Sequence, residues 1–130
     1  MRLQFEFRSE KFPKLPGEEQ RINPGLWGQK LAEYLKENLR RRGFHALQIV
    51  AEDWGYIVPI QNEEFELWVG CGHQAGDPDE FLCFIEPQSP VIRRWFRKID
   101  TTAVVSRLSA ALEEILSTDP DIWYRPSANS

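Results

Sequence analysis

The centre of the chain carries four short apolar segments in succession, joined by polar turns, and this pattern restricts the fold more than any other feature. The segments are residues 45–51, 56–60, 65–71 and 81–86. The third shows the alternation most clearly, with one face formed by Phe65, Leu67, Val69 and Cys71. A period of two predicts strands, and consecutive strands with short connections predict an antiparallel meander. Pro59 further suggests an edge or an irregularity in the second segment.

The N-terminal flank predicts one more strand and one helix. Residues 3–8 alternate in the same way, and residues 9–25 are rich in proline and glycine, which indicates a loop. We expect a helix with Asn23 as N-cap and Pro24 as its first residue, ending at Gly43. Its apolar stripe would be Trp27, Leu31, Tyr34, Leu35 and Leu39.

The C-terminal flank predicts two further helices. The first would begin at Ser89-Pro90, with an apolar face of Val91, Ile92, Trp95, Phe96 and Ile99. The second would be capped by Asp100 or Thr101 and end at Asp119-Pro120, leaving an irregular tail from about residue 119. The predicted order is β-α-β-β-β-β-α-α. The chain is then an α+β fold, a meander of four to five strands with helices packed on one face.

The length and composition fit one domain over residues 1–130, because 42% of the residues are apolar and can form a core. The N-terminus lacks the apolar segment of a signal peptide, and no stretch is apolar enough to span a bilayer. The chain has two cysteines, which fits a reducing compartment. We therefore expect a cytoplasmic protein without a membrane partner.

Charge is distributed unevenly along the chain. Residues 43–92 contain no lysine or arginine, whereas the flanks carry all sixteen basic residues and eleven acidic ones. The block holds nine acidic residues: Glu52, Asp53, Glu63, Glu64, Glu66, Asp77, Asp79, Glu80 and Glu86. The predicted sheet is therefore anionic and the helical ends are cationic.

Two interpretations of this acidic block stay open. The flanking cations, Arg40 to Arg42 or Arg93, Arg94, Arg97 and Lys98, would neutralise it internally, in exposed pairs that contribute roughly 0–1 kcal/mol each. Alternatively, the block attracts a basic partner. Nucleic acid is an unlikely ligand for such a face, since phosphate binding requires positive charge. The four cations of residues 93–98 would lie on one side of the predicted helix, where they could contact nucleic acid. A solvated polar face explains them equally well, and the net charge of the chain opposes nucleic-acid binding.

Bulky apolar side chains are predicted on both faces of the sheet. Trp68 points away from Leu67 and Val69, and Leu82 and Phe84 point away from Cys83. Helices cover one face, and we expect the N-terminal loop and the C-terminal tail to cover the other. If that second face is exposed instead, aromatic and acidic residues together are typical of a protein-binding hot spot.

Chemical alternatives centre on the cysteines and histidines. Cys71 and Cys83 are placed to face each other across a hairpin, where they could form a disulfide, or a metal site with His45 and His73. We expect two buried free thiols, with no metal and no cofactor. Cys71 with His73 as its base, or the Glu52-Asp53 pair beside Trp54, would suit a small enzyme. No established catalytic or nucleotide-binding motif is present.

Four strings resemble those of a family of small bacterial, mostly proteobacterial, proteins of uncharacterised function. They are EDWGY (52–56), FELWVGCG (65–72), FLCFIEP (81–87) and IRRWFRKID (92–100). The resemblance covers roughly residues 45–115. It implies a bacterial origin and a compact α+β domain, and it implies no activity and no functional residues.

We expect a protein-binding module whose acidic, aromatic-containing sheet docks a basic partner, of the immunity-protein or inhibitor type. The expected contact residues are Glu52, Asp53, Trp54, Tyr56, Glu63, Glu64, Glu66 and Trp68. The alternative is a small enzyme or ligand-binding domain with a site near Glu52, Asp53, Trp54, Cys71 and His73. The Lys/Arg-free block contains Trp54, Tyr56 and Trp68, and this combination favours binding over catalysis.

Overall fold

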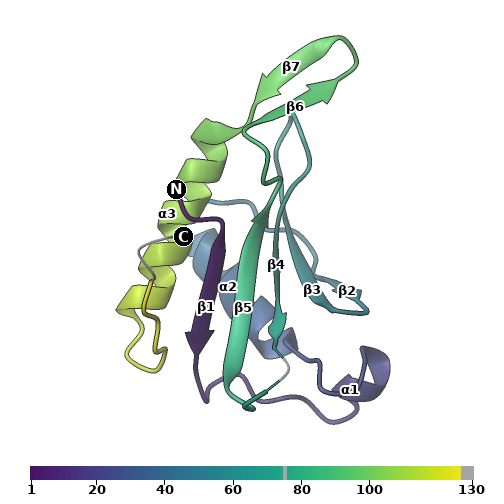
Figure 1. Ribbon diagram of the computed structural model, residues 1–130, viewed down its shortest axis with the longest axis vertical. Coiled ribbons are helices and arrows are strands. Elements are labelled where there is room, and N and C mark those ends of the chain that lie inside the picture. The colour runs from purple at the N-terminus through teal and green to yellow at the C-terminus, as the bar shows by residue number, and fades with distance from the viewer. Residues whose placement is uncertain (75, 127–130) are drawn as a thin grey trace.

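The computed structural model describes residues 1–74 and 76–126, and it shows an α+β fold. Five antiparallel strands form one sheet in the order β1-β5-β4-β3-β2 (Figure 1). The strands are β1 (Gln4–Arg8), β2 (Val50–Glu52), β3 (Gly55–Ile60), β4 (Leu67–His73) and β5 (Glu80–Glu86). The predicted antiparallel meander is confirmed for β2 to β5, and β1 joins it beside β5.

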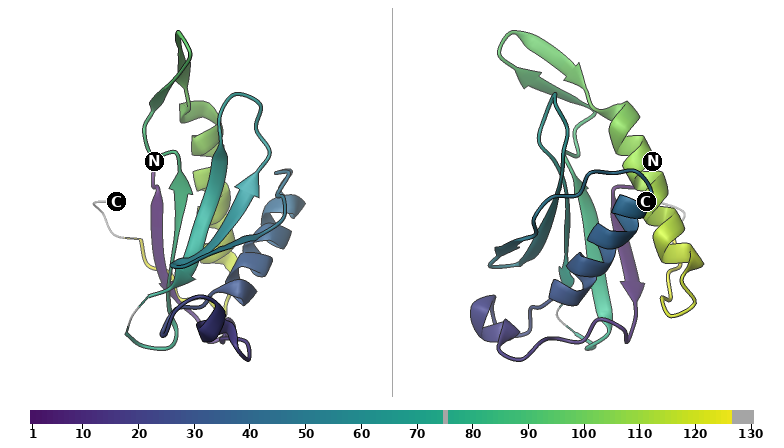
Figure 2. Two further views of the ribbon diagram at one scale, coloured as in Figure 1. Left: turned by 90° about the vertical axis from the view of Figure 1, so that its right-hand side faces the viewer. Right: turned by 180° about the vertical axis from the view of Figure 1, so that it is seen from behind.

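Two helices cover one face of this sheet, as predicted. They are α2 (Gln29–Arg41) and α3 (Thr102–Thr118), and Figure 2 shows both on the same side of the strands. The apolar stripes of the helices meet the inward face of the sheet in one core. Fully buried members of this core are Leu31, Leu35, Leu39, Val58, Val69, Phe81, Cys83, Ile85, Leu108 and Leu112.

The segment predicted as a helix from Ser89 is a β-hairpin, made of β6 (Val91–Arg94) and β7 (Arg97–Asp100). Its apolar residues fit a helical period, but only Ile92 and Ile99 pack inward, as cross-strand partners. Valine, isoleucine and aromatic residues favour strands. The spacing of these apolar residues fits a hairpin of two strands as well as it fits a helix. The hairpin projects beyond the end of the sheet (Figure 1). The predicted element order was therefore wrong at this point.

The start predicted for the helix at Asn23 was also wrong, because α2 begins at Gln29 with Gly28 as its N-cap. Trp27 instead runs beside β4, where its carbonyl oxygen accepts the N–H of His73 at 2.7 Å. A side chain at Gly28 would lie 2.9 Å from the Cα of Gly72, so the two backbones pack directly. The predicted loop also contains a short helix, α1 (Glu18–Arg21).

Glu18 fixes this loop although it is a fully buried carboxylate. Its Oε2 accepts the N–H groups of Gly28 and Gln29 and the hydroxyl of Tyr56, each at 2.8 Å. Its Oε1 accepts the N–H of Leu15 at 2.8 Å. Glu18 thus satisfies free N–H groups at the start of α2, where negative charge is favoured.

Burial by itself raises the pKa of Glu18. The hydrogen bonds from the amides of Leu15, Gln29 and Gly28 and from the Tyr56 hydroxyl outweigh that effect, and they leave the pKa below its ordinary value. The carboxylate is therefore charged at neutral pH, and it is stabilised by directed donors rather than by a cation.

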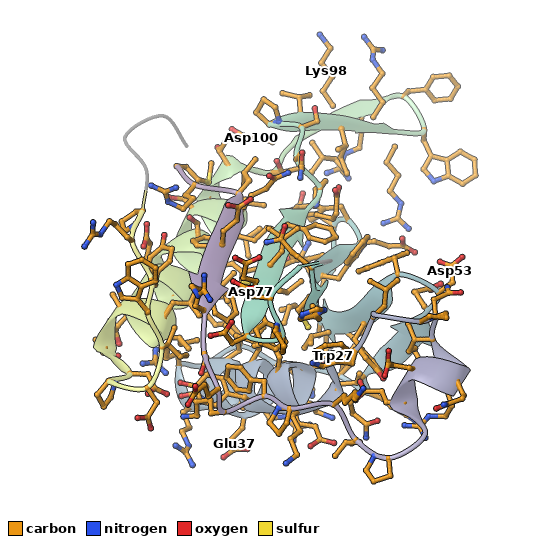
Figure 3. The ribbon with its side chains drawn as sticks, turned by 60° about the horizontal axis from the view of Figure 1, so that its bottom comes forward. Trp27, Glu37, Asp53, Asp77, Lys98 and Asp100 are labelled. Carbon is orange, nitrogen blue, oxygen red and sulfur yellow. The ribbon has the colours of Figure 1, made fainter. Side chains whose placement is uncertain are left out.

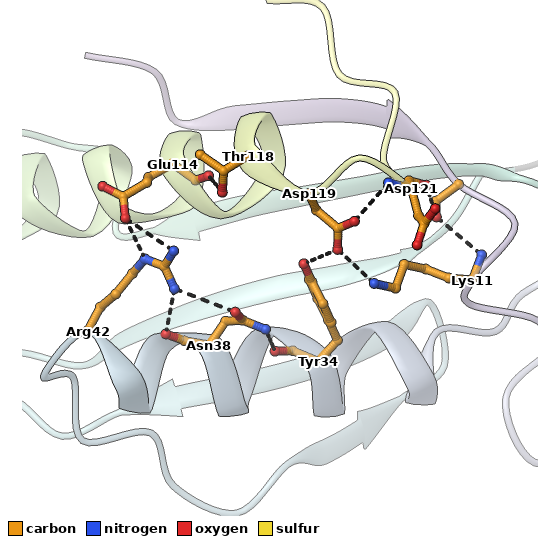
Figure 4. Close-up of polar contacts among 9 residues, drawn as sticks. Lys11, Tyr34, Asn38, Arg42, Glu114, Thr118, Asp119 and Asp121 are labelled. Carbon is orange, nitrogen blue, oxygen red and sulfur yellow. Dashed lines mark hydrogen bonds and ion pairs between the residues drawn. The ribbon is translucent and has the colours of Figure 1, made fainter.

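A second polar network joins α2, α3 and the N-terminal loop (Figure 4). The Oδ2 of Asp119 accepts the hydroxyl of Tyr34 at 2.6 Å and the ammonium of Lys11 at 2.7 Å. At the other end of the helix pair, Arg42 lies 3.1 Å from Glu114. The end predicted for the last helix at Asp119 is confirmed, and Asp119 also ties the helix ends together.

The N-terminal loop and the C-terminal tail lie at the margins of the sheet. Trp123 pairs with Arg8 at the outer edge of β1 through two backbone hydrogen bonds of 2.8 and 2.9 Å. Phe12 is buried in the core on the helix side. Over residues 1–74 and 76–126 neither segment covers the second face, so our expectation that they cover it was wrong for the described part of the chain (Figures 1 and 2). Within the described residues, no helix has the length and apolar character needed to cross a membrane.

Candidate functional site

The open face, which we define as the side of the five-stranded sheet away from α2 and α3, carries three aromatic side chains in mutual contact. The ring centroids of Trp54 and Phe84 are 5.6 Å apart, those of Trp68 and Phe84 are 5.8 Å apart, and those of the two tryptophans are 6.2 Å apart. We call these three residues the aromatic cluster. Trp54 is 37% exposed, and the other two are half-buried. Apolar rings of this size are therefore accessible on a face with no covering layer.

Gly70 leaves the space in which the cluster forms. It lies opposite Phe84 in the pairing of β4 with β5, and a Cβ at this position would be 2.4 Å from the Phe84 ring. No L-residue with a side chain fits there unless the ring moves. The Phe84 ring therefore lies directly over Gly70 of β4 and contacts both tryptophans.

A tight turn holds Trp54 over the face. Glu52 pairs with Gly55, which leaves Asp53 and Trp54 as the two turn residues between β2 and β3. The amide of Asn23 donates to the carbonyl oxygen of Asp53 at 2.6 Å, so the N-terminal loop supports the turn. A Cβ at Gly55 would approach the carbonyl oxygen of Cys71 to 2.5 Å, which explains why only glycine fits there. Asp53 points outward from the turn (Figure 3).

Part of the acidic block is neutralised within the chain, although mostly not by the cations that we predicted. Arg8 lies within 3.0 Å of Asp77 and Asp79 and 3.2 Å of Glu80. Arg97 approaches the carboxylate of Glu64 to 3.9 Å. Among the described residues, the other five acidic side chains have no basic partner and no hydrogen-bond donor: Glu52, Asp53, Glu63, Glu66 and Glu86.

Four of these carboxylates, those of Glu52, Asp53, Glu66 and Glu86, lie beside the aromatic cluster, and Glu63 lies in the loop before β4. Glu52 is at the β2 edge of the open face, and Glu86 lies opposite Trp68 in the strand pairing. Glu66 shares the outward side with Trp68, two residues away. A groove of about 1000 Å³ continues from this end of the face towards the base of the hairpin. Its lining includes the carboxylates Glu63, Glu66 and Glu86 and, from the hairpin, Ile92, Arg93 and Arg94. The open face thus combines an apolar centre with an anionic margin.

The structure brings only part of the predicted site together. Glu52, Asp53, Trp54, Glu66 and Trp68 lie on or beside the open face. Two of the remaining predicted residues, Glu63 and Glu64, lie in the loop before β4 near the hairpin.

The prediction of Tyr56 as a contact residue was wrong. Tyr56 is buried on the helix side, and its hydroxyl donates a hydrogen bond to Glu18. The alternation along β3 places Tyr56 opposite in direction to Ile57, which faces outward. Phe84, Glu86 and Gly70 belong to the surface but were not among the predicted contact residues. Phe84 and Glu86 alternate with the buried Cys83 and Ile85, which is the signal that could have identified them.

The residues of the alternative enzyme site are divided between the two faces. Cys71 and Cys83 are direct cross-strand partners in the core, and both are free thiols. Burial raises the pKa of each thiol well above its ordinary value, which opposes thiolate formation. Glu52, Asp53 and Trp54 lie at the β2–β3 turn, whereas the side chain of Cys71 points into the core.

His73 is equally occupied by structural contacts. Its two ring nitrogens lie 2.8 Å from the carbonyl oxygens of Gly25 and Asp77, and its ring stacks on Trp27 with centroids 3.6 Å apart. Neither nitrogen is free to act as a base for Cys71. Within residues 1–74 and 76–126, no three His, Cys, Asp or Glu side chains are grouped in a way that could hold a metal ion.

We compared the chain with protein-family models, with curated proteins and with solved structures, and none of the three comparisons gave a match. The resemblance to a bacterial family therefore stays a prediction. The functional argument below depends on the geometry and charge of this chain alone.

Proposed function

We propose that this protein is a protein-binding module whose open face docks a basic partner protein, in the manner of a small immunity protein or inhibitor. The observation that carries the proposal is the aromatic cluster, which no described part of the chain covers. The carboxylates beside it have no basic partner among the described residues. Accessible aromatic rings within a polar margin are typical of the energetic centre of an interface. The charge of the margin favours a partner with lysine and arginine around an apolar patch.

The exposed carboxylates of the open face would attract a basic partner before the two surfaces touch. Glu52, Asp53, Glu63 and Glu66 are exposed to solvent, so their charges destabilise the free chain little. Each carboxylate is stabilised when a cation of the partner approaches it. A single-sign margin raises the association rate with a partner of opposite charge, and salt screens this attraction over about 8–10 Å. We therefore expect binding to weaken as the salt concentration rises.

A capture experiment tests the proposal. Tagged wild-type protein is incubated with a lysate of the source cells, next to an open-face variant with Glu52→Lys, Glu63→Lys and Glu66→Lys. A matched control carries Glu10→Lys, Glu33→Lys and Glu37→Lys, which make the same charge change at exposed positions outside the margin. We expect mass spectrometry to identify a basic protein that the wild type and the control retain and that the open-face variant loses.

Two results would contradict the proposal. One is capture of the same proteins by all three forms, because the open face would then contribute nothing. The other is loss of the captured protein in the control as well as in the open-face variant, because net charge rather than this surface would then explain the binding.

A further inference from the structure

The hairpin of residues 91–100, which we call the arm, carries the two most exposed aromatic side chains among the described residues. Trp95 is 89% exposed and Phe96 is 104% exposed, and together they form its two-residue tip. Trp95 has a φ of 60°, a left-handed conformation that is uncommon for a bulky residue, and asparagine or glycine usually occupies such turn positions. The tip thus presents two rings to solvent in a conformation that its sequence does not favour.

The base of the arm is held in place, so the tip has a defined position. Ile99 is buried and pairs with Ile92 across the hairpin. The guanidinium of Arg94 donates to the carbonyl oxygen of Glu64 at 3.1 Å, which fastens the arm to the loop before β4. The arm points away from the sheet (Figure 1), and the side chain of Lys98 extends from its outer side (Figure 3). The tip therefore lies away from the open face of its own chain, whereas Ile92, Arg93 and Arg94 at the base line the groove that continues from that face.

The charges of the arm favour an anionic partner. Arg93 lies directly opposite Lys98, and Arg94 lies directly opposite Arg97. Like charges in facing positions of an antiparallel pair are destabilising. Among the described residues, Arg93 and Lys98 have no acidic partner. Carboxylates on a partner would relieve both repulsive pairs while an apolar surface covers the tip.

The open face has the chemistry that complements the arm. It offers aromatic rings to Trp95 and Phe96, and it offers unpaired carboxylates at Glu52, Glu66 and Glu86 to the four cations. The arm carries four basic residues and one acidic one, which leaves the rest of the chain with twelve basic and nineteen acidic residues. An anionic membrane or a nucleic acid would attract the arm but repel the rest of the chain. The charge balance therefore favours an acidic protein surface.

We propose that the arm of one copy docks on the open face of a second copy, with the tip against the aromatic cluster and the cations against the carboxylate margin. The proposal rests on the proposed function, because it names an occupant for the same face. The arm and the open face are different surfaces of the chain. Two copies can therefore exchange arms reciprocally in a dimer with a two-fold axis, or successive copies can bind head to tail in an open assembly. A foreign basic partner then competes with the arm, and self-association shields the aromatic cluster until that partner arrives.

Sedimentation velocity over a range of protein concentrations tests this contact. The wild type is compared with a tip variant (Trp95→Ser, Phe96→Ser), an arm-reversed variant (Arg93→Glu, Lys98→Glu) and a face-reversed variant (Glu52→Lys, Glu66→Lys). All six positions are exposed, so each variant is expected to fold. We expect concentration-dependent association of the wild type and loss of that association in all three variants. A chain that carries both reversals should associate again, because the attraction is restored with opposite signs.

Other outcomes overturn the proposal and separate it from the proposed function. A wild type that stays monomeric, or that associates equally well in the tip variant, removes the arm–face contact. If the capture experiment nevertheless retains a basic protein through the open face, the proposed function stands and only the self-contact fails. Tip-dependent binding to vesicles containing phosphatidylserine, or to a single-stranded oligonucleotide, without self-association would assign the arm to that polyanion instead.

Discussion

Replacing Glu18 by glutamine is expected to lower the free energy of unfolding by about 3–5 kcal/mol. Several buried hydrogen bonds to a charged acceptor are lost, and the new amide N–H₂ group faces other donors. The carboxylate accepts from three backbone N–H groups and from the Tyr56 hydroxyl. The amide nitrogen of glutamine cannot accept a hydrogen bond, so at least one group of buried donors is left without an acceptor. Urea unfolding of the two proteins at neutral pH measures the loss. Glu33→Gln, at an exposed position of α2, is the control and should change stability by less than about 0.5 kcal/mol.

The pH dependence gives this prediction a second readout. The pKa of Glu18 is lowered in the folded state, so its stabilising contribution is present above the ordinary glutamate value of 4.5 and is lost as the pH falls through the folded pKa. The difference in stability between the wild type and Glu18→Gln should therefore narrow below about pH 4.5. A difference that stays constant through this range would show that Glu18 is not held as a buried carboxylate.

Replacing Trp68 by alanine is expected to weaken binding of the captured basic protein by about 30-fold or more, since the central aromatic residue of an interface commonly contributes at least about 2 kcal/mol. Trp68 contacts both other members of the aromatic cluster and lies opposite Glu86. Its removal takes away the apolar centre and leaves the carboxylate margin intact. Isothermal titration with the purified partner measures the change.

Two further variants distinguish a lost contact from a lost fold. Trp68→Phe keeps an apolar ring and should recover most of the affinity. Trp123→Ala removes a 59% exposed tryptophan at the β1 edge and should leave the affinity unchanged. Equal losses for Trp68→Ala and Trp123→Ala would mean that the open face is not the binding surface.

The strands and the orientation of their side chains were predictable from the sequence because strand alternation is a local signal. The inward direction of Cys71 and Cys83 and the outward direction of Trp68 and Phe84 follow directly from a period of two. The last helix was equally clear, since its predicted cap at Asp100 or Thr101 agrees with the observed N-cap Thr101, and its predicted end at Asp119-Pro120 agrees with the observed C-cap Asp119.

The errors arose where distant residues determine the local conformation. The start of α2 depends on the carboxylate of Glu18, which lies ten positions before Gly28 and satisfies its amide. The arm has a spacing that fits a helix and a hairpin alike, and packing of Ile99 beneath it decides between them. The neutralisation of Asp77, Asp79 and Glu80 by Arg8 was missed because β1 joins β5 from the far end of the sequence.

The candidate site could be outlined from the sequence but not delimited. The Lys/Arg-free block includes the carboxylates that lie beside Trp54 and Trp68 on the open face, and both tryptophans were among the expected contact residues. Tyr56 was included wrongly. The two-residue turn at Asp53 and Trp54 sets which residues of β3 face outward, and it places Tyr56 on the helix side. The role of Gly70 as the floor beneath Phe84 becomes visible only when the two strands are paired.

Carboxyl footprinting of the chain with and without its captured partner tests the central claim most directly. A carbodiimide couples glycine ethyl ester to accessible carboxylates, and mass spectrometry reports the modification of each residue. We predict that the partner protects Glu52, Glu66 and Glu86 around the aromatic cluster and leaves Glu33 and Glu37 on α2 as reactive as before. Protection of Glu33 and Glu37 with unchanged labelling of the other three would place the partner on the helices and contradict the account.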